Sequence, residues 1–182
     1  MKLILIDGGP SSGKNTLGIL LVKEFQKLSN KSILLDLDVC VEKYNPSWIW
    51  NSKEKEEKDQ QKARVNFAKD INNYLQQNYV VIAIGERFLT KTDIANFINR
   101  LKITSPIYLY HLSIPFSLRT QRLHERGPHS LIDLEKDQTE RDLNVKWYGY
   151  VYKNINSENI DTQNLFKLIH DGKGLIDINL FK

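Results

Sequence analysis

The chain has a single cysteine, Cys40, and no long hydrophobic run. One cysteine cannot build an internal disulfide framework, and it fits a reducing compartment. The apolar segment near the N-terminus stops at Asp7, which makes it too short for the hydrophobic region of a signal peptide. No segment approaches the ~20 consecutive apolar residues of a membrane span. We therefore expect a cytoplasmic protein that is not associated with a membrane.

Internal repeats, low-complexity segments and linkers are also absent from the sequence. The 182 residues, with 41% hydrophobic and 26% charged side chains, suit one globular domain over residues 1–182. The net charge of +4 comes from basic residues mixed with acids along the whole chain. An anionic substrate explains such a mild excess as well as nucleic acid would, so a nucleic-acid partner is not expected. Nothing in the sequence indicates an oligomeric state.

Short apolar runs alternate with longer amphipathic stretches, which predicts an α/β fold around a parallel sheet. Five strands are expected, at Leu3–Ile6, Ser32–Leu37, Val80–Ile84, Ile107–Leu112 and Asn154–Asn156. Helices are expected over residues 14–29, 54–77, 92–103, 161–171 and from Pro115 to Arg126. A separate helix is expected after His129, and it ends at about residue 152.

A glycine-rich segment between the first strand and the first helix is the strongest functional signal. It consists of Gly8, Gly9, Pro10, Ser11, Ser12, Gly13, Lys14, Asn15 and Thr16. Glycines let successive backbone N–H groups converge on one phosphate group, and the helix N-terminus adds partial positive charge. Lys14 is then expected to reach the β- and γ-phosphates of a nucleotide. The alternative is a glycine turn that binds nothing.

Asn15 departs from the phosphate-loop pattern, which has serine or threonine after the lysine. The hydroxyl that usually ligates Mg²⁺ is therefore missing, and the Asn15 amide oxygen or a water must serve instead. Thr16 still supplies a hydroxyl beside the phosphates. We expect Asn15 and Thr16 to lie at the Mg²⁺ site.

Acidic residues end the second and third predicted strands, where ligands bind in open parallel sheets. If the second strand continues through Asp38, Asp36 and Asp38 share one face. Asp38 is the candidate general base, and Asp36 is assigned to the substrate side, where it could orient water around Mg²⁺. The alternative for Asp38 is capping of the following helix.

Glu86 and Arg87 follow the third strand. Glu86 fits the acid that holds the water shell of Mg²⁺, and both residues are candidates for substrate binding. Arg87 could clamp an anionic group or merely pair with Glu86.

Arg119, Arg122 and Arg126 are spaced i, i+3, i+7 and so share one helix face. Arg119 is expected to bind the nucleotide, whereas Arg122 and Arg126 offset the charge on the transferred phosphoryl group. Gly127 and Pro128 end this helix, as a lid over about residues 115–142 requires. The alternative is a solvated basic face.

The segments GGPSSGKNT, LDVCVEKYNP and VVIAIGERFL resemble, in order, the chloramphenicol phosphotransferase-like P-loop kinases, over roughly residues 1–90. The resemblance implies a three-layer α/β/α fold with a five-stranded parallel sheet and a helical lid. It also places Asp38 and Lys14 where that family has its catalytic aspartate and its phosphate-loop lysine. It does not name the acceptor.

The sequence thus predicts a kinase that uses ATP and Mg²⁺ to phosphorylate a hydroxyl group of a small molecule. A nucleoside or nucleotide kinase is the first alternative. A nucleotide-binding regulator and an RNA-end-processing module are further alternatives from a different class.

Overall fold

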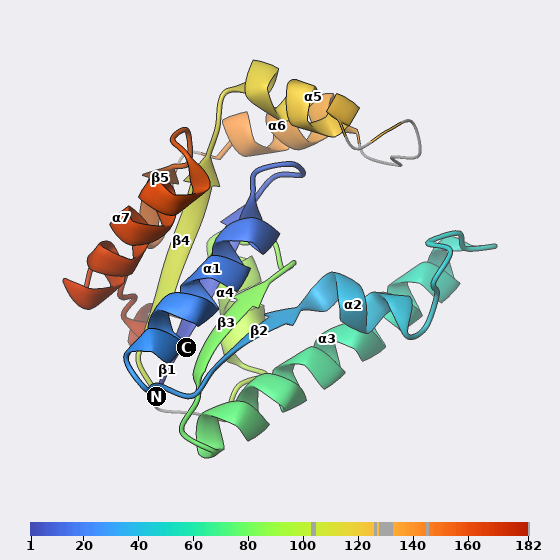
Figure 1. Ribbon diagram of the computed structural model, residues 1–182. Coiled ribbons are helices and arrows are strands. Elements are labelled where there is room, and N and C mark those ends of the chain that lie inside the picture. The colour runs from blue at the N-terminus through green and yellow to red at the C-terminus, as the bar shows by residue number, and fades with distance from the viewer. Residues whose placement is uncertain (103–104, 126, 128–132, 145, 182) are drawn as a thin grey trace.

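The computed structural model describes residues 1–102, 105–125, 127, 133–144 and 146–181 (Figure 1). Its strands are β1 (Lys2–Gly8), β2 (Ser32–Asp36), β3 (Val80–Ile84), β4 (Ile107–Ser113) and β5 (Tyr150–Lys153). Its helices are α1 (Lys14–Lys27), α2 (Leu37–Glu42), α3 (Lys53–Gln76), α4 (Lys91–Ile98), α5 (Phe116–Glu125), α6 (Leu134–Asp142), α7 (Glu158–His170) and the 3-10 turn η1 (Ile178–Phe181). None of these helices has the length and apolarity needed to cross a bilayer.

The five strands form one parallel sheet in the order β2-β3-β1-β4-β5. β1 lies at the centre, where Leu5 is in register with Ala83 of β3 and Leu109 of β4. Its residues from Leu3 to Gly8 are buried, as expected for a central parallel strand covered on both faces. The loop after β1 therefore leaves the middle of the sheet edge.

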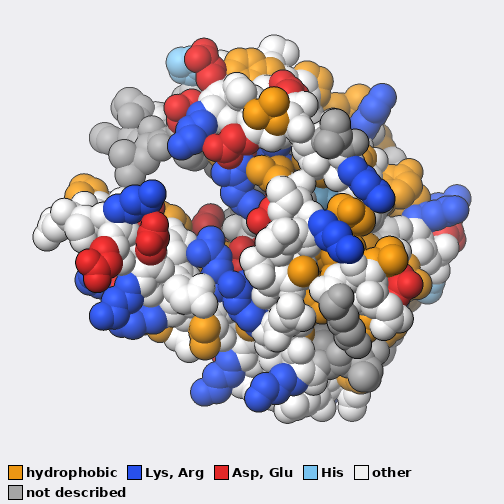
Figure 2. All heavy atoms as spheres, turned by 180° about the vertical axis from the view of Figure 1, so that it is seen from behind, with side chains coloured by type: hydrophobic (Ala, Val, Ile, Leu, Met, Phe, Trp, Pro, Cys, Tyr) orange, Lys and Arg blue, Asp and Glu red, His pale blue; other side chains and the backbone are white. Residues whose placement is uncertain are grey.

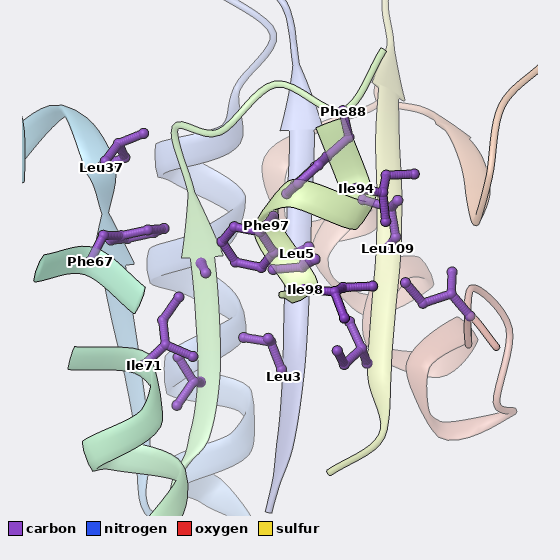
Figure 3. Packing of buried hydrophobic residues seen from close by; sticks show 14 of the residues in the cluster. Leu3, Leu5, Leu37, Phe67, Ile71, Phe88, Ile94, Phe97, Ile98 and Leu109 are labelled. Atoms are coloured by element: carbon purple, nitrogen blue, oxygen red, sulfur yellow. The ribbon is translucent and has the colours of Figure 1, made fainter. Parts of the chain in front are cut away.

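Two apolar cores fill the two faces of the sheet. The period of two sends Leu3 and Leu5 to the face covered by α3 and α4, and Ile4 and Ile6 to the face covered by α1 and α7. Figure 3 shows the first core, with Phe67 of α3 among the side chains that pack with Leu3 and Leu5. The three-layer α/β/α architecture predicted from the sequence is confirmed.

The second strand was predicted one residue too long. β2 ends at Asp36 because this side chain accepts a hydrogen bond from the backbone N–H of Asp38, 3.0 Å away, and so caps α2. A helix at this point was considered only in the alternative in which Asp38 caps it, and the alternation used to place Asp36 and Asp38 on one strand face is wrong. Asp36, not Asp38, is the capping residue.

The fifth strand lies earlier than predicted, at Tyr150–Lys153 instead of residues 154–156, and the helix expected to continue to about residue 152 ends at Asp142. Pairing with β4 decides this, since Tyr110 to Ser113 bond to the four residues from Tyr150 to Lys153. A four-residue edge strand has too short a pattern to be recognised from the sequence alone.

The helices α5 and α6 lie together beyond the carboxyl ends of the strands, above the loop between β1 and α1 (Figure 1). We call this pair of helices the lid. On the opposite side of that loop, α2 and the N-terminal part of α3 extend away from the sheet.

Candidate functional site

The loop between β1 and α1 has the backbone of a phosphate loop. Ser11 and Gly13 have positive φ angles of 59° and 89°, and the N–H of Ser12 bonds to the carbonyl of Gly9 over 3.2 Å. Alternating left- and right-handed residues turn neighbouring N–H groups towards one point. The buried Ser11 and Ser12 hydroxyls have no hydrogen-bond partner in the described part of the chain. Phosphate oxygens could accept hydrogen bonds from both the loop N–H groups and the two serine hydroxyls.

Two glycines let the loop pack closely against its surroundings. A Cβ atom at Gly8 would collide with the side chain of Ser12, and one at Gly9 would collide with Arg119 and Asp137. A larger residue at either position would therefore force the loop or these side chains to shift.

The side chain of Lys14 is folded over the loop. Its Nζ donates to the carbonyls of Gly8, at 2.7 Å, and Gly9, at 3.1 Å. Burial lowers the pKa of Lys14, while the nearby carboxylate of Asp7 opposes that shift. The ammonium group is thus held against the backbone of the loop.

A cavity of about 440 Å³ lies over the loop and reaches the ends of β2 and β3 and the lid. Figure 2 shows the molecule hollowed on this side, with basic and acidic side chains on the walls. The lining residues are Gly8, Pro10 to Asn15, Asp36, Asp38, Gly85, Glu86, Arg87, Asp133, Lys136, Asp137, Glu140 and Arg141.

Asp38 lies in the first turn of α2 and lines this cavity. Its side chain can be reached from the cavity, yet the surrounding protein removes enough water to raise its pKa to about 6, with the charge of Asp36 adding to the shift and that of Lys14 opposing it. A carboxyl group with a pKa near 6 can act as a general base near neutral pH.

Asn15 and Asp36 are hydrogen-bonded to each other in the wall of this cavity. The amide nitrogen of Asn15 donates to Oδ2 of Asp36 over 3.0 Å. Thr16, by contrast, lines a separate cavity of about 270 Å³ beside Arg122 and Asn154. Of the three residues expected at the Mg²⁺ site, Asn15 and Glu86 line the same cavity as Asp36 and Asp38, whereas Thr16 does not.

The oxygen atoms at this point suit Mg²⁺, which prefers oxygen ligands and keeps several waters and phosphate oxygens in its shell. Asn15 offers an amide oxygen, and Asp36 and Asp38 line the same cavity with their carboxylates. Within the described residues, no three acidic, histidine or cysteine side chains form a metal cluster of their own. The residues fit an ion that is bound mainly through the nucleotide.

Glu86 lies between two arginines. Its Oε2 accepts from Nε of Arg64 over 3.3 Å, and Arg100 approaches Oε1 to 4.0 Å. Burial raises the pKa of Glu86, while Arg64 opposes that shift. These contacts favour a structural role, although Glu86 also lines the main cavity.

Arg87 turns to the lid instead of pairing with Glu86. Its Nη2 donates to Asp137 over 3.2 Å and to Glu140 over 2.6 Å. Arg87 therefore connects the end of β3 to α6, and it also lines the main cavity.

A buried network of charges joins the lid to the sheet. Both terminal nitrogens of Arg141 donate to the carboxylate of Asp7, which also contacts Nδ1 of His111 at 2.9 Å. Arg141 and Arg119 both bond to Asp137. Sequence reasoning overlooked the roles of Asp7 and Asp137 in this network. Asp7 in a central strand and His111 in a neighbouring one were the available signals, since the two are in register.

The arginines of α5 have different surroundings. Arg119 is buried, and its Nε donates to the carbonyl of Pro10 over 3.1 Å, so it supports the phosphate loop from behind. Arg122 lines the cavity that also contains Thr16 and Asn154. Arg126 lies outside the described residues, as do Pro128 and His129 of the predicted lid segment.

A third cavity, of about 590 Å³, adjoins the main one on the side of α3. Asp38, Gly85 and Arg87 line both. The wall of the third cavity also contains Trp48 and Arg64 together with Lys53, Glu56, Glu57, Gln60 and Gln61. Arg64 was missed from the sequence because it lies within a long polar helix with no motif.

Comparisons with known proteins agree on the fold. Residues 1–86 match the model of a family described as chromatin associated protein KTI12. No curated protein matches the chain. A sugar kinase from Janibacter sp. HTCC2649 has a TM-score of 0.68 at 13% identity, over 93% of this chain and 95% of that chain.

Two further solved structures are similar. The APS kinase CysC of Mycobacterium tuberculosis, in complex with AMPPNP and APS, has a TM-score of 0.63 at 10% identity, over 93% of this chain and 97% of that one. Shikimate kinase from Acinetobacter baumannii, in complex with shikimate, has a TM-score of 0.58 at 21% identity, over 95% of each chain. The chain has the fold of small P-loop kinases, and the narrower resemblance to chloramphenicol phosphotransferases stays a prediction.

Proposed function

We propose that the protein transfers the γ-phosphoryl group of ATP to a hydroxyl group of a small polar molecule. The observation that carries this proposal is the position of Asp38, which lines both the cavity over the phosphate loop and the adjoining cavity beside α3. A carboxylate at such a junction can accept the proton of an acceptor hydroxyl as it attacks the γ-phosphorus.

The other residues have complementary roles in this proposal. The loop N–H groups and Lys14 bind the phosphates, and Asn15 would help to hold a Mg²⁺ ion that offsets part of their charge. Arg122 contacts the nucleotide from the side of α5, and Arg87 and Arg141 connect the lid to the cavity. Arg119 holds the loop in position through the carbonyl of Pro10.

The acceptor is proposed to enter through the cavity beside α3. Polar and charged side chains of α3 provide most of its wall, and Trp48 is its large aromatic member. Such a wall suits an acceptor with several hydrogen-bonding groups better than a predominantly apolar one. A nucleoside or nucleotide acceptor fits the same description, and strong inhibition by a dinucleoside polyphosphate that spans both cavities would favour it.

A second candidate function is that of a nucleotide-binding regulator. It is supported by the match of residues 1–86 to a family whose description names chromatin association instead of catalysis. A regulator would bind ATP without turnover of any small acceptor. An RNA-end-processing module would instead bind RNA with an affinity that falls steeply with salt.

The test is ADP release from Mg·ATP across nucleosides, nucleotides, sugars, shikimate, aminoglycosides and chloramphenicol. Stimulation by one acceptor, lost in Asp38→Asn while ATP binding persists, would establish both the reaction and the substrate class. Tight ATP binding without stimulation by any acceptor would favour the regulator.

A further inference from the structure

The contact between Asn15 and Asp36 fixes which way round the Asn15 amide lies. An ionised carboxylate only accepts hydrogen bonds, so the group that faces Oδ2 of Asp36 at 3.0 Å must be the amide NH₂. The amide oxygen then points away from Asp36. No hydrogen bond to that oxygen is present in the part of the chain that the structure describes.

Asp36 is itself held in place by the fold. Its other oxygen, Oδ1, accepts the N–H of Asp38 over 3.0 Å as the cap of α2. The carboxylate therefore has one oxygen bound to the start of α2 and the other to Asn15, and it has little freedom to rotate. Both side chains line the cavity over the phosphate loop.

We propose that Asp36 positions Asn15 so that the Asn15 amide oxygen serves as the protein ligand of the Mg²⁺ that accompanies the bound nucleotide. This inference rests on the proposed function, because it presupposes a nucleotide in the loop. The hydroxyl of the usual serine or threonine can rotate to present its oxygen without help. An amide has a nitrogen at one end and an oxygen at the other, and it needs a partner that selects the oxygen.

Replacing Asp36 with asparagine tests the orientation with little change in shape. Asparagine caps helices as well as aspartate, so α2 keeps its first turn. The N–H of Asp38 still requires the oxygen of the new side chain, which leaves its NH₂ group facing Asn15. Asn15 then reverses to offer its oxygen to position 36 and turns its NH₂ group towards the metal. An NH₂ group cannot ligate Mg²⁺.

Replacing Asn15 with threonine in the Asp36→Asn background provides the rescue. A hydroxyl at position 15 is the residue type of the ordinary phosphate loop and needs no partner to orient it. If Asp36 acts through Asn15, the double variant regains metal binding. If Asp36 instead acts on the metal directly or through a water, the double variant stays as weak as Asp36→Asn.

Binding of Mn²⁺, a paramagnetic substitute for Mg²⁺, is measured in the presence of saturating ADP from the free-ion signal in electron paramagnetic resonance. We expect Asp36→Asn to weaken Mn²⁺ retention about tenfold or more, as loss of an orienting partner commonly does, and the double variant to recover most of it. ADP binding without metal should stay unchanged. Asp177→Asn is the matched control, since Asp177 also accepts an N–H two residues ahead, 3.0 Å away, but lies outside the cavity.

The outcomes separate the two proposals. Wild-type protein that binds no ADP would refute the proposed function. Wild-type protein that retains Mn²⁺ with ADP, together with an Asp36→Asn variant that retains it equally well, would overturn only the orientation of Asn15 by Asp36. If Asp36→Asn loses Mn²⁺ and the added Asn15→Thr substitution does not restore it, the orientation of Asn15 by Asp36 is overturned as well.

Discussion

Arg141 in the lid places its two terminal nitrogens 3.2 Å from the two carboxylate oxygens of Asp7, a residue 134 positions earlier in the chain. This bidentate ion pair is almost entirely shielded from solvent, with 10% of the Arg141 side chain and none of the Asp7 side chain exposed. Removal of the Asp7 carboxylate leaves Arg141 with Asp137 as its remaining acidic partner and takes the carboxylate away from His111, which is costly for buried groups. The pair therefore makes the stability of the lid depend on a residue of the central strand.

Asp7→Asn is expected to destabilise the protein by about 3–5 kcal/mol, because Arg141 and His111 lose the charge that they share. For a chain of this size, such a loss lowers Tm by about 6–20 °C. Thermal unfolding followed by circular dichroism measures it, with the exposed Asp177→Asn as the control, which should change stability by no more than about 0.5 kcal/mol. An unchanged Tm in Asp7→Asn would show that the ion pair contributes nothing net.

The same pair predicts how stability depends on acid. Burial alone would raise the pKa of Asp7, but the hydrogen bond from His111 and the charge of Arg141 outweigh it and hold the pKa well below its usual value of 3.8. The contribution of Asp7 is therefore complete above pH 3.8 and is lost as the pH falls below that value. The slope of stability against pH in this acid range should be smaller in Asp7→Asn.

Lys14→Ala should weaken nucleotide binding and phosphoryl transfer together. The ammonium group is the one loop cation that lies against the Gly8 and Gly9 carbonyls, and alanine supplies no charge for the β- and γ-phosphates. Calorimetric titration with ATP and the ADP-release assay measure the two effects. Full activity in this variant would refute the assignment of the loop as the phosphate site.

The rate of transfer should fall as the pH falls through about 6. Asp38 acts as a base only when ionised, and its pKa is raised to about 6, so protonation removes the base over this range. A plot of kcat/KM for the acceptor against pH should show this acid limb. A value of kcat/KM that does not change as the pH falls through about 6 would contradict the role of Asp38 as the base.

Arg64→Gln should raise the KM of the acceptor about tenfold and leave the KM of ATP unchanged. Arg64 uses Nε for Glu86, and its side chain lines the cavity beside α3, where it can donate to the acceptor. Arg100→Gln is the matched control, because Arg100 approaches the same Glu86 but does not line that cavity. If both variants raise the KM of the acceptor equally, the effect comes from a lost contact with Glu86 and not from a lost contact with the acceptor.

The sequence was sufficient to predict the architecture and the phosphate loop. Both depend on local patterns, such as the apolar strand around Leu5 and the Gly13-Lys14 step at the start of α1, and these patterns lie within short windows. β5 was misplaced because its position depends on pairing with β4, which no local window contains.

The site was predicted less completely, for a physical reason. Asp38 and Asn15 were recognised because they lie beside a strand end or within a motif. Arg64 and Asp137 belong to polar helices, and only the fold shows that they face a cavity. The ion pair of Asp7 with Arg141 depends on folding of the lid onto the sheet, so no spacing rule could indicate it.

The strand order has a consequence for how such a protein can change. Because β1 lies between β3 and β4, the phosphate loop separates two regions: β2 to α3 on one side, and β4 to α7 on the other. The first region contributes most of the wall of the proposed acceptor cavity. The second contributes the lid and, with Arg122 and Asn154, part of the wall of the cavity beside Thr16. Replacement of residues 37–79 with the equivalent segment of another small kinase could therefore change the specificity for the acceptor while nucleotide binding is retained.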